Sequence, residues 1–315
     1  MGLNIITAKE PIHIETIITF IYGDPGLGKT SLGFSAKNPI LFDFDQGAHR
    51  SGHFRKDAVQ IKQWSEVANF TAADLADYDT IIIDTVGRCL ESIVDFLRSD
   101  SKNLRRGSSE LSIQGYGKLS SIFKSWLQLL RSMGKDIVLL AHTSEDKDGD
   151  NVIKRPDAIG GSKKEMYKVA DQMAYLTQER GQNGMERRLN FVPSDSYHAK
   201  DSGAIGNVIM TDLDKNPEQL ANIIQQAKDH INSLTDAALK TQQELDEFRS
   251  NVMDAETPER LNELGKGIGQ HVMRPAMLAD LKARATHLGY EHTANGFALP
   301  APATESEPEP EPADA

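Results

Sequence analysis

The sequence predicts an α/β protein with a mostly parallel sheet. Three observations support this prediction: short apolar segments alternate with amphipathic ones up to about residue 235, a glycine-rich stretch follows the first apolar run, and a later apolar run ends in an aspartate. Alternating strands and helices favour crossover connections, which make neighbouring strands parallel. With 315 residues, 39% of them hydrophobic, the chain can bury a substantial core and carry a smaller second unit.

Each expected element has a local reason. Aliphatic and β-branched runs bounded by turn residues predict strands at Thr16–Tyr22, Ile40–Phe44, Thr80–Asp84 and Asp136–Ala141. Two more strands, Gln172–Gln178 and Arg187–Val192, flank "RGQNG" and are expected to form an antiparallel hairpin at the C-terminal end of the sheet. Apolar residues at helical spacing predict helices at Lys29–Lys37, Ser65–Leu75, Val86–Arg98, Tyr116–Met133 and Pro217–Ser233.

Beyond residue 235 the pattern becomes helical only. We expect a core over residues 1–234 and a small all-α module over residues 235–290, in which Thr257 and Pro258 begin one helix. Residues 291–315 are rich in Pro, Glu and Ala and cannot bury enough apolar surface to fold, so they are predicted to form a disordered acidic tail.

Composition restricts the cellular setting. The single cysteine, Cys89, excludes an internal disulfide and suits a reducing cytoplasm. The N-terminus shows no secretory signal, and no apolar run approaches the ~18–20 residues that span a bilayer. A cytoplasmic protein without a membrane partner is therefore expected. The net charge of −11 is partly local, because residues 301–315 carry five acidic side chains and no base.

The stretch "GDPGLGKT", residues 23–30, fits the phosphate-binding pattern G-x-x-x-x-G-K-[ST] between a strand and a helix. Glycines let successive backbone N–H groups point inward around a phosphate, and the following helix adds its positive end. Lys29 is expected to reach the β- and γ-phosphates and Thr30 to hold Mg²⁺, which makes ATP and Mg²⁺ the expected cofactors. The expected nucleotide-binding residues are Gly23, Asp24, Pro25, Gly26, Leu27, Gly28, Lys29, Thr30 and Ser31.

Two apolar strands end in carboxylates. In "DTIIIDT", Asp84 is expected to hold Mg²⁺ opposite Thr30. Many AAA-type motors carry a glutamate directly after this aspartate as the base that activates water, but this chain has Thr85 there. In "ILFDFDQG", Asp43 and Asp45 share one face of a strand. Asp45 is expected to orient the attacking water with Asp43 in support; the alternative is that one caps a loop and the other is solvated.

These motifs resemble the RecA-like recombinase ATPases over roughly residues 14–195. The resemblance rests on "GDPGLGKT", "FDFDQGA", "IIIDT", the long helix in "YGKLSSIFKSWLQLLRS", "DIVLLAH" and "AIGGSKKEMYKVAD". Within the family, the chain is most similar to phage-encoded RecA-like single-strand annealing proteins of the Sak group. The resemblance implies a RecA-like core, ATP hydrolysis with His142 as a γ-phosphate sensor, and a homo-oligomer that is either a ring or a filament. Asp45 stands where RecA has glutamate and His142 where RecA has glutamine.

The resemblance also implies that two loops hold single-stranded DNA. The first is about Ser99–Gly115, with Lys102, Arg105 and Arg106; the second is about Thr143–Gly161, with Lys154 and Arg155. The alternative is that both are ordinary solvated loops. Neither contains an aromatic residue for base stacking, and the second is also acidic, so binding is expected to be salt-sensitive and independent of base sequence.

Three functions remain open at this point. The leading one is a single-stranded-DNA-dependent ATPase in phage-type annealing, recombination or replication. The second is a non-catalytic nucleotide switch that recruits single-strand-binding or other replication proteins through the helical module. The third is a small-molecule kinase, for which the chain offers no clear arginine-rich lid. Lys200 in "YHAKD" is a candidate for a residue that acts across a subunit interface.

Overall fold

The computed structural model divides the chain into two compact units: His13–Ser233, and a second unit of Met1–Ile12 with Leu234–Ala315. The structure describes residues 6–7, 10–148, 151–159, 162–181, 184–293 and 296–300. The acidic part of the expected tail, residues 301–315, therefore lies outside the described residues. None of the described helices combines the length and apolar character needed to cross a membrane.

The first unit is built on one large sheet. Over the described residues this sheet has eight strands in the order β10-β9-β8-β1-β5-β4-β2-β3. Neighbours from β8 to β3 pair in parallel, whereas β9 pairs antiparallel with both β8 and β10. The strands are β1 (Ile18–Gly23), β2 (Pro39–Asp43), β3 (Ala58–Gln60), β4 (Thr80–Asp84), β5 (Asp136–Ala141), β8 (Gln172–Gly181), β9 (Gly184–Asn190) and β10 (Asn207–Met210). The predicted α/β fold, a mostly parallel sheet with an antiparallel hairpin near its C-terminal end, is confirmed.

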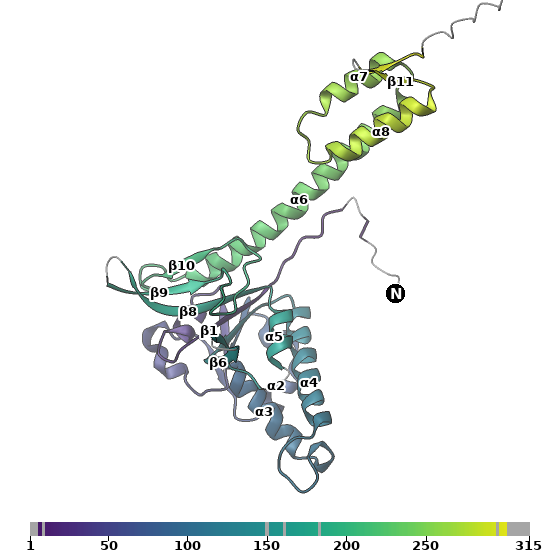
Figure 1. Cartoon of the computed structure of the whole chain (residues 1–315). Coiled ribbons are helices and arrows are strands. Elements are labelled where there is room, and N and C mark those ends of the chain that lie inside the picture. The colour runs from purple at the N-terminus through teal and green to yellow at the C-terminus, as the bar shows by residue number, and fades with distance from the viewer. Residues whose placement is uncertain are drawn as a thin grey trace, which may run out of the picture. The chain divides into compact units, whose positions relative to one another are not determined.

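Helices cover both faces of this sheet because its central strands are apolar on both sides. In β4, Ile81 and Ile83 pack into one core cluster and Ile82 into the other. Figure 1 shows α3, α4 and α5 gathered on one side of the strands. The helical segments of this unit are α1 (Lys29–Gly33), η1 (Ala48–Phe54), α2 (Ser65–Ala68), η2 (Ala72–Leu75), α3 (Val86–Arg98), η3 (Ser101–Asn103), α4 (Ile113–Ser132), α5 (Ser162–Val169) and the start of α6 (Gln219–Asp254).

Four predicted elements differ from the structure. The helix expected over Lys29–Lys37 already ends at Gly33. The helix expected over Ser65–Leu75 is two short pieces: α2 ends at Ala68, and Thr71 begins η2, where its N–H and hydroxyl donate hydrogen bonds to Asp74. The segment expected as a second DNA-binding loop contains a two-stranded hairpin, β6 (Thr143–Asp148) and β7 (Asn151–Pro156). The helix expected to end at Ser233 continues as α6 to Asp254.

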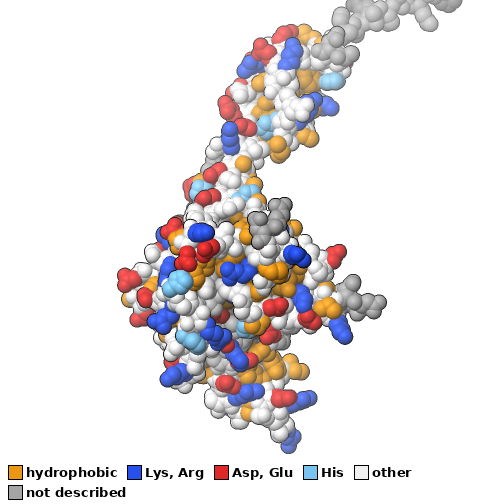
Figure 2. Space-filling view, turned by 90° about the vertical axis from the view of Figure 1, so that its left-hand side faces the viewer, with side chains coloured by type: hydrophobic (Ala, Val, Ile, Leu, Met, Phe, Trp, Pro, Cys, Tyr) orange, Lys and Arg blue, Asp and Glu red, His pale blue; other side chains and the backbone are white. Residues whose placement is uncertain are grey.

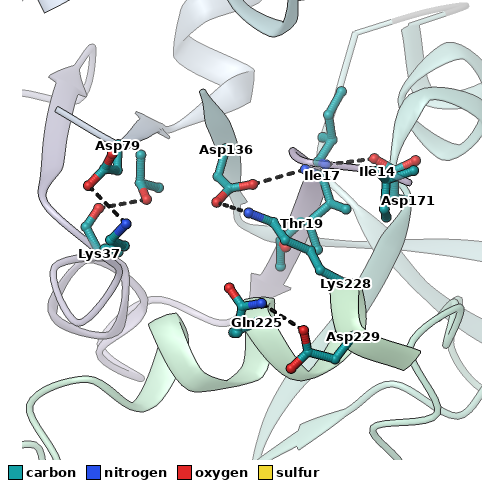
Figure 3. Close-up of polar contacts among 12 residues, drawn as sticks. Ile14, Ile17, Thr19, Lys37, Asp79, Asp136, Asp171, Gln225, Lys228 and Asp229 are labelled. Atoms are coloured by element: carbon teal, nitrogen blue, oxygen red, sulfur yellow. Dashed lines mark hydrogen bonds and ion pairs between the residues drawn. The ribbon is translucent and has the colours of Figure 1, made fainter. Parts of the chain in front are cut away.

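The amino ends of β1 and β5 are held by the buried carboxylate of Asp136 (Figure 3). Asp136 accepts hydrogen bonds from the Ile17 N–H at 2.9 Å and from the Lys228 ammonium at 2.6 Å. The Asp136 and Lys228 side chains are only 10% and 12% exposed. Removing either partner would leave an uncompensated buried charge, so this pair fixes the first part of α6 on the sheet.

The second unit is a small helical module with its own core. It contains the later part of α6, α7 (Pro258–Gly267), α8 (Arg274–His287) and the short strands β11 (Glu291–Thr293) and β12 (Gly296–Ala298). Thr257 caps α7 by accepting a hydrogen bond from the Arg260 N–H, and Pro258 occupies the first turn, as predicted. Leu245, Leu261 and Leu281 are among the residues of its apolar core.

The expectation that disorder begins at residue 291 is wrong for the hairpin β11–β12. The Asn262 side chain accepts a hydrogen bond from the Phe297 N–H at 2.8 Å and donates one to the Phe297 carbonyl at 2.9 Å. The Phe297 ring also packs edge-on against His292. One aromatic residue and one amide thus anchor the strands β11 and β12, which composition alone assigns to a tail.

Candidate functional site

A cavity of about 160 Å³ lies where the central parallel strands end. Residues of the glycine-rich loop form one wall, and Asp45, Asp84 and His142 contribute from the ends of three other segments. Because β2, β4 and β5 are neighbours in the sheet, their carboxyl ends bring these three side chains to one place. Ligands in open parallel sheets bind at this edge.

The glycines of the loop are required for different reasons. Gly26 and Gly28 have φ angles of 81° and 84°, which favour glycine. A Cβ on Gly23 would lie 2.5 Å from the Leu176 carbonyl oxygen, and a Cβ on Gly28 would lie 2.6 Å from a guanidinium nitrogen of Arg187. The loop is thus packed against β8 and β9 from behind.

Lys29 is buried at the mouth of the loop. Its ammonium donates hydrogen bonds to the carbonyl oxygens of Gly23 at 2.8 Å and Asp24 at 3.0 Å. Burial lowers the pKa of Lys29, and the nearby carboxylate of Asp84 opposes this shift. Because the ammonium is already buried, little further desolvation is needed when an anion binds beside it.

Thr30 and Asp84 meet across the cavity. The Thr30 hydroxyl donates a hydrogen bond of 2.6 Å to the Asp84 carboxylate, which is only 6% exposed. Burial raises the pKa of Asp84 to about 6, although the Thr30 hydrogen bond and the charge of Lys29 both lower it. A hydroxyl and a carboxylate oxygen at this distance suit Mg²⁺, which takes few protein ligands and shares the rest with phosphates and water.

The structure separates the roles of Asp43 and Asp45. Asp43 is fully buried, and its two oxygens accept hydrogen bonds of 2.9 Å from the N–H groups of Gly47 and Ala48. Asp43 therefore holds the turn that leads into η1. Asp45 lines the cavity, and its carboxylate pairs with Arg50 at 3.0 Å and Arg88 at 3.7 Å.

His142 connects the cavity to the β6–β7 hairpin. It follows β5, and its carbonyl oxygen accepts a hydrogen bond of 2.7 Å from the Asp157 N–H just after β7. Its Nδ1 atom is buried without a hydrogen-bond partner among the described residues. Burial, followed by the charge of Lys29, lowers the pKa of His142 and thus favours the neutral imidazole.

Sequence reasoning missed three polar residues around the cavity. Arg50 and Ser51 on η1 line it directly, while Arg187 on β9 donates a hydrogen bond of 3.3 Å to the Leu27 carbonyl behind the loop. The cluster "HRSGH", three residues after the acidic pair, was the available signal for the first two. Nothing in the sequence pairs Arg187 with a loop that lies 160 positions earlier.

The basic residues expected to hold DNA lie on two segments. Loop 99–112 joins α3 and α4 at their end far from the sheet (Figure 1). It is ordered around Asn103, whose side chain donates to the Leu97 carbonyl and accepts from Lys118. Within it, Lys102 and Arg106 are exposed, and Arg105 lies 3.7 Å from Glu110.

On the β6–β7 hairpin, the basic residues have acidic partners. Lys154 pairs with Glu145, and Arg155 pairs with Asp146 at 2.9 Å across the two strands. An aromatic residue comes from elsewhere in the chain: Tyr197 lies beside Lys154 and its ring packs 5.2 Å from that of Tyr175. Lys200 donates its ammonium hydrogen bond to the Ala170 carbonyl at 2.7 Å.

Comparison with known proteins identifies a family whose model matches most of the first unit. The model of a family described as "AAA domain" matches residues 15–202. No curated protein matches the sequence. Among solved structures, the chain is similar to a KaiC-like protein from the hyperthermophilic archaeon Pyrococcus horikoshii, with 12% identity, a TM-score of 0.35, and coverage of 62% of this chain and 89% of that chain.

Proposed function

The chain belongs to the AAA domain family, and from this premise we propose that it is an ATPase that is stimulated by single-stranded DNA. The observation that carries the nucleotide part is the contact of 2.6 Å between Thr30 and Asp84 beside the buried ammonium of Lys29. The RecA-like resemblance carries the DNA part, and with it a role in phage-type annealing, recombination or replication. A cytoplasmic location and a homo-oligomeric state, ring or filament, belong to the same proposal.

The residues of the site take distinct roles in this proposal. Loop residues 23–31, which include Lys29, bind the phosphates. Thr30 and Asp84 would hold Mg²⁺, which would neutralise charge on the phosphates when bound. Asp45 orients the attacking water, because Thr85 carries no carboxylate and instead caps α3. His142 contacts the terminal phosphate through its unpartnered ring nitrogen. Among the described residues, no group of three or more His, Cys, Asp or Glu could hold a metal by itself, which agrees with an ion shared with phosphates.

A second cavity offers space for the base of the nucleotide. It measures about 260 Å³ and shares Ser31 with the phosphate cavity. Its walls include Phe34, Phe54 and Leu213, which are apolar and suit a flat aromatic ring. We place the nucleobase there.

In this proposal, single-stranded DNA binds to loop 99–112 and the β6–β7 hairpin. Lys102 and Arg106 offer exposed charge, and Tyr197 offers a partly exposed ring beside Lys154. Glu145 and Asp146 compete with phosphates for Lys154 and Arg155. On the face of the molecule drawn in Figure 2, acidic and basic side chains are interspersed. Both features favour binding that is modest and strongly weakened by salt.

The test measures ATP turnover with and without an unstructured oligonucleotide, for the wild type, Lys29→Ala and Lys37→Ala. Lys37 is a control lysine whose side chain is 72% exposed and outside the cavity. We expect DNA to raise turnover in the wild type and Lys37→Ala, and no turnover in Lys29→Ala. Turnover indifferent to DNA would contradict the DNA part, and unchanged turnover in Lys29→Ala would contradict the site. ATP binding without turnover would favour the nucleotide switch, for which the paired state of Asp45 is an argument.

A further inference from the structure

The side chain of Arg50 occupies an unusual position for an exposed arginine. It lies on η1 and lines the same cavity as Thr30 and Asp84, with 63% of the side chain exposed. Its guanidinium donates a hydrogen bond of 3.0 Å to the carboxylate of Asp45. The proposed phosphate cavity thus contains a largely exposed positive charge that is paired with the proposed base.

The turn before η1 is built to hold this guanidinium. Asp43 anchors the turn by accepting the N–H groups of Gly47 and Ala48, and Gln46 adopts a positive φ of 52°. A Cβ on Gly47 would lie 2.8 Å from one guanidinium nitrogen of Arg50 and 2.9 Å from its central carbon. The guanidinium therefore rests directly on the backbone of Gly47, a position that any side chain there would block.

A second side chain of the same turn points to a ligand in this cavity. Ser51 is 6% exposed and lines the cavity, yet its hydroxyl has no hydrogen-bond partner among the described residues. Buried hydroxyls in native proteins are normally hydrogen-bonded. An oxygen-rich ligand such as a phosphate would supply that partner next to Arg50.

The pairing of Arg50 with Asp45 is easily exchanged. An ion pair between partly exposed side chains contributes only ~0–1 kcal/mol. Guanidinium–phosphate pairs are charge-assisted and often bidentate, and are therefore stronger. The neighbouring Arg88 is less available, because it donates a 2.6 Å hydrogen bond to Glu91. Arg50 is the cation that a terminal phosphate can recruit with little loss.

We propose that Arg50 reads the terminal phosphate of the bound nucleoside triphosphate within its own chain, exchanging Asp45 for that phosphate. In the absence of the γ-phosphate, Arg50 neutralises Asp45; in its presence, Asp45 keeps only the longer 3.7 Å contact with Arg88, and its carboxylate can hold water. Nucleotide state and availability of the base are thereby coupled through one side chain. This inference rests on the proposed function.

The test compares dissociation constants for a non-hydrolysable ATP analogue and for ADP, both with Mg²⁺. The variants are Arg50→Ala, Arg50→Lys and the control His49→Ala, an exposed neighbour on η1 outside the cavity. We expect Arg50→Ala to weaken analogue binding about tenfold and ADP binding less than about twofold, as loss of a charge-assisted contact to one phosphate predicts. Arg50→Lys should recover part of the difference, and His49→Ala should match the wild type.

The outcomes separate this inference from the proposed function. A wild type that binds neither nucleotide removes the proposed function itself. A wild type that prefers the analogue, with the same preference kept in Arg50→Ala, overturns only the role of Arg50. Equal loss of analogue and ADP affinity also overturns it, because the side chain would then support the site without reading the γ-phosphate. Circular dichroism verifies folding, and Arg50→Gln, which keeps two of the three methylene groups and removes the charge, replaces Arg50→Ala if that variant does not fold.

Discussion

Replacing Asp84 with asparagine should stabilise the metal-free protein at neutral pH, although it removes a proposed Mg²⁺ ligand. Asp84 is 6% exposed, and burial raises its pKa from 3.8 to about 6. Asparagine has the same shape and keeps an oxygen that can accept the Thr30 hydrogen bond. The substitution therefore removes mainly the buried charge.

The size and sign of the effect follow from the pKa. A shift of about two units corresponds to about 3 kcal/mol. Because the folded-state pKa is raised, the contribution of Asp84 to stability is fully present below about pH 4 and is lost as the pH rises through about 6. At pH 7.5 the carboxylate is charged in both states, and the folded state bears the cost of its burial. Asp84→Asn should then be more stable than the wild type by up to about 3 kcal/mol, which raises the melting temperature by roughly 6–12 °C.

The assay is thermal unfolding of both proteins in a chelator from pH 4 to pH 8. The advantage of Asp84→Asn should grow with pH between about 4 and 6 and then level off, and Mg·ATP should stabilise the wild type more than the variant. Asp43→Asn is the matched control: it is also buried, but both of its oxygens accept N–H groups, so an amide there should destabilise the protein. A metal-free Asp84→Asn protein that melts below the wild type at pH 7.5 would refute the reasoning.

Three other predictions concern the candidate site and the proposed DNA-binding segments. Asp45→Asn should keep nucleotide binding and lower turnover by ~10²-fold, and steady-state kinetics that match the wild type would move the base elsewhere. His142→Ala should still bind ATP and DNA but lose the difference in DNA affinity between ATP-analogue and ADP states. The reason is that His142 borders the cavity and its carbonyl holds the end of the β6–β7 hairpin. Binding isotherms in both nucleotide states test this prediction. Replacing Arg105 and Arg106 together by alanine should flatten the salt dependence of single-strand binding, and an unchanged slope would place the DNA elsewhere.

The sequence predicts best the elements whose stability is local and apolar. The bounds expected for β4, β5 and α3 coincide with those observed. These segments are continuous apolar runs, or strongly periodic ones, with a clear start and stop, so burial and local propensity agree. For the same reason Lys29, Thr30 and Asp84 could be placed together: a motif fixes two of them, and parallel pairing fixes the third.

What the sequence could not supply depends on pairing between polar segments. The β6–β7 hairpin has no apolar alternation along β6, and cross-strand pairs such as Lys154 with Glu145 help to hold it together. The role of Asp43 is hidden for a related reason. Strand alternation places it beside Asp45, but the turn after β2 bends back so that its N–H groups reach Asp43 and leave Asp45 to the cavity.

The position after Asp84 shows how the sheet can bring a carboxylate from a neighbouring strand to the cavity. Thr85 is buried and accepts a hydrogen bond from the Arg88 N–H, so it serves as the cap of α3 and offers no carboxylate. Strand β2 pairs directly with β4, with Asp43 opposite Asp84, and the Asp45 N–H donates a hydrogen bond of 3.2 Å to the Asp84 carbonyl. A carboxylate two residues beyond that register therefore reaches the cavity from the neighbouring strand. Because Asp45 leads into the turn that carries Arg50, the proposed base can be paired by an arginine five residues further along the chain.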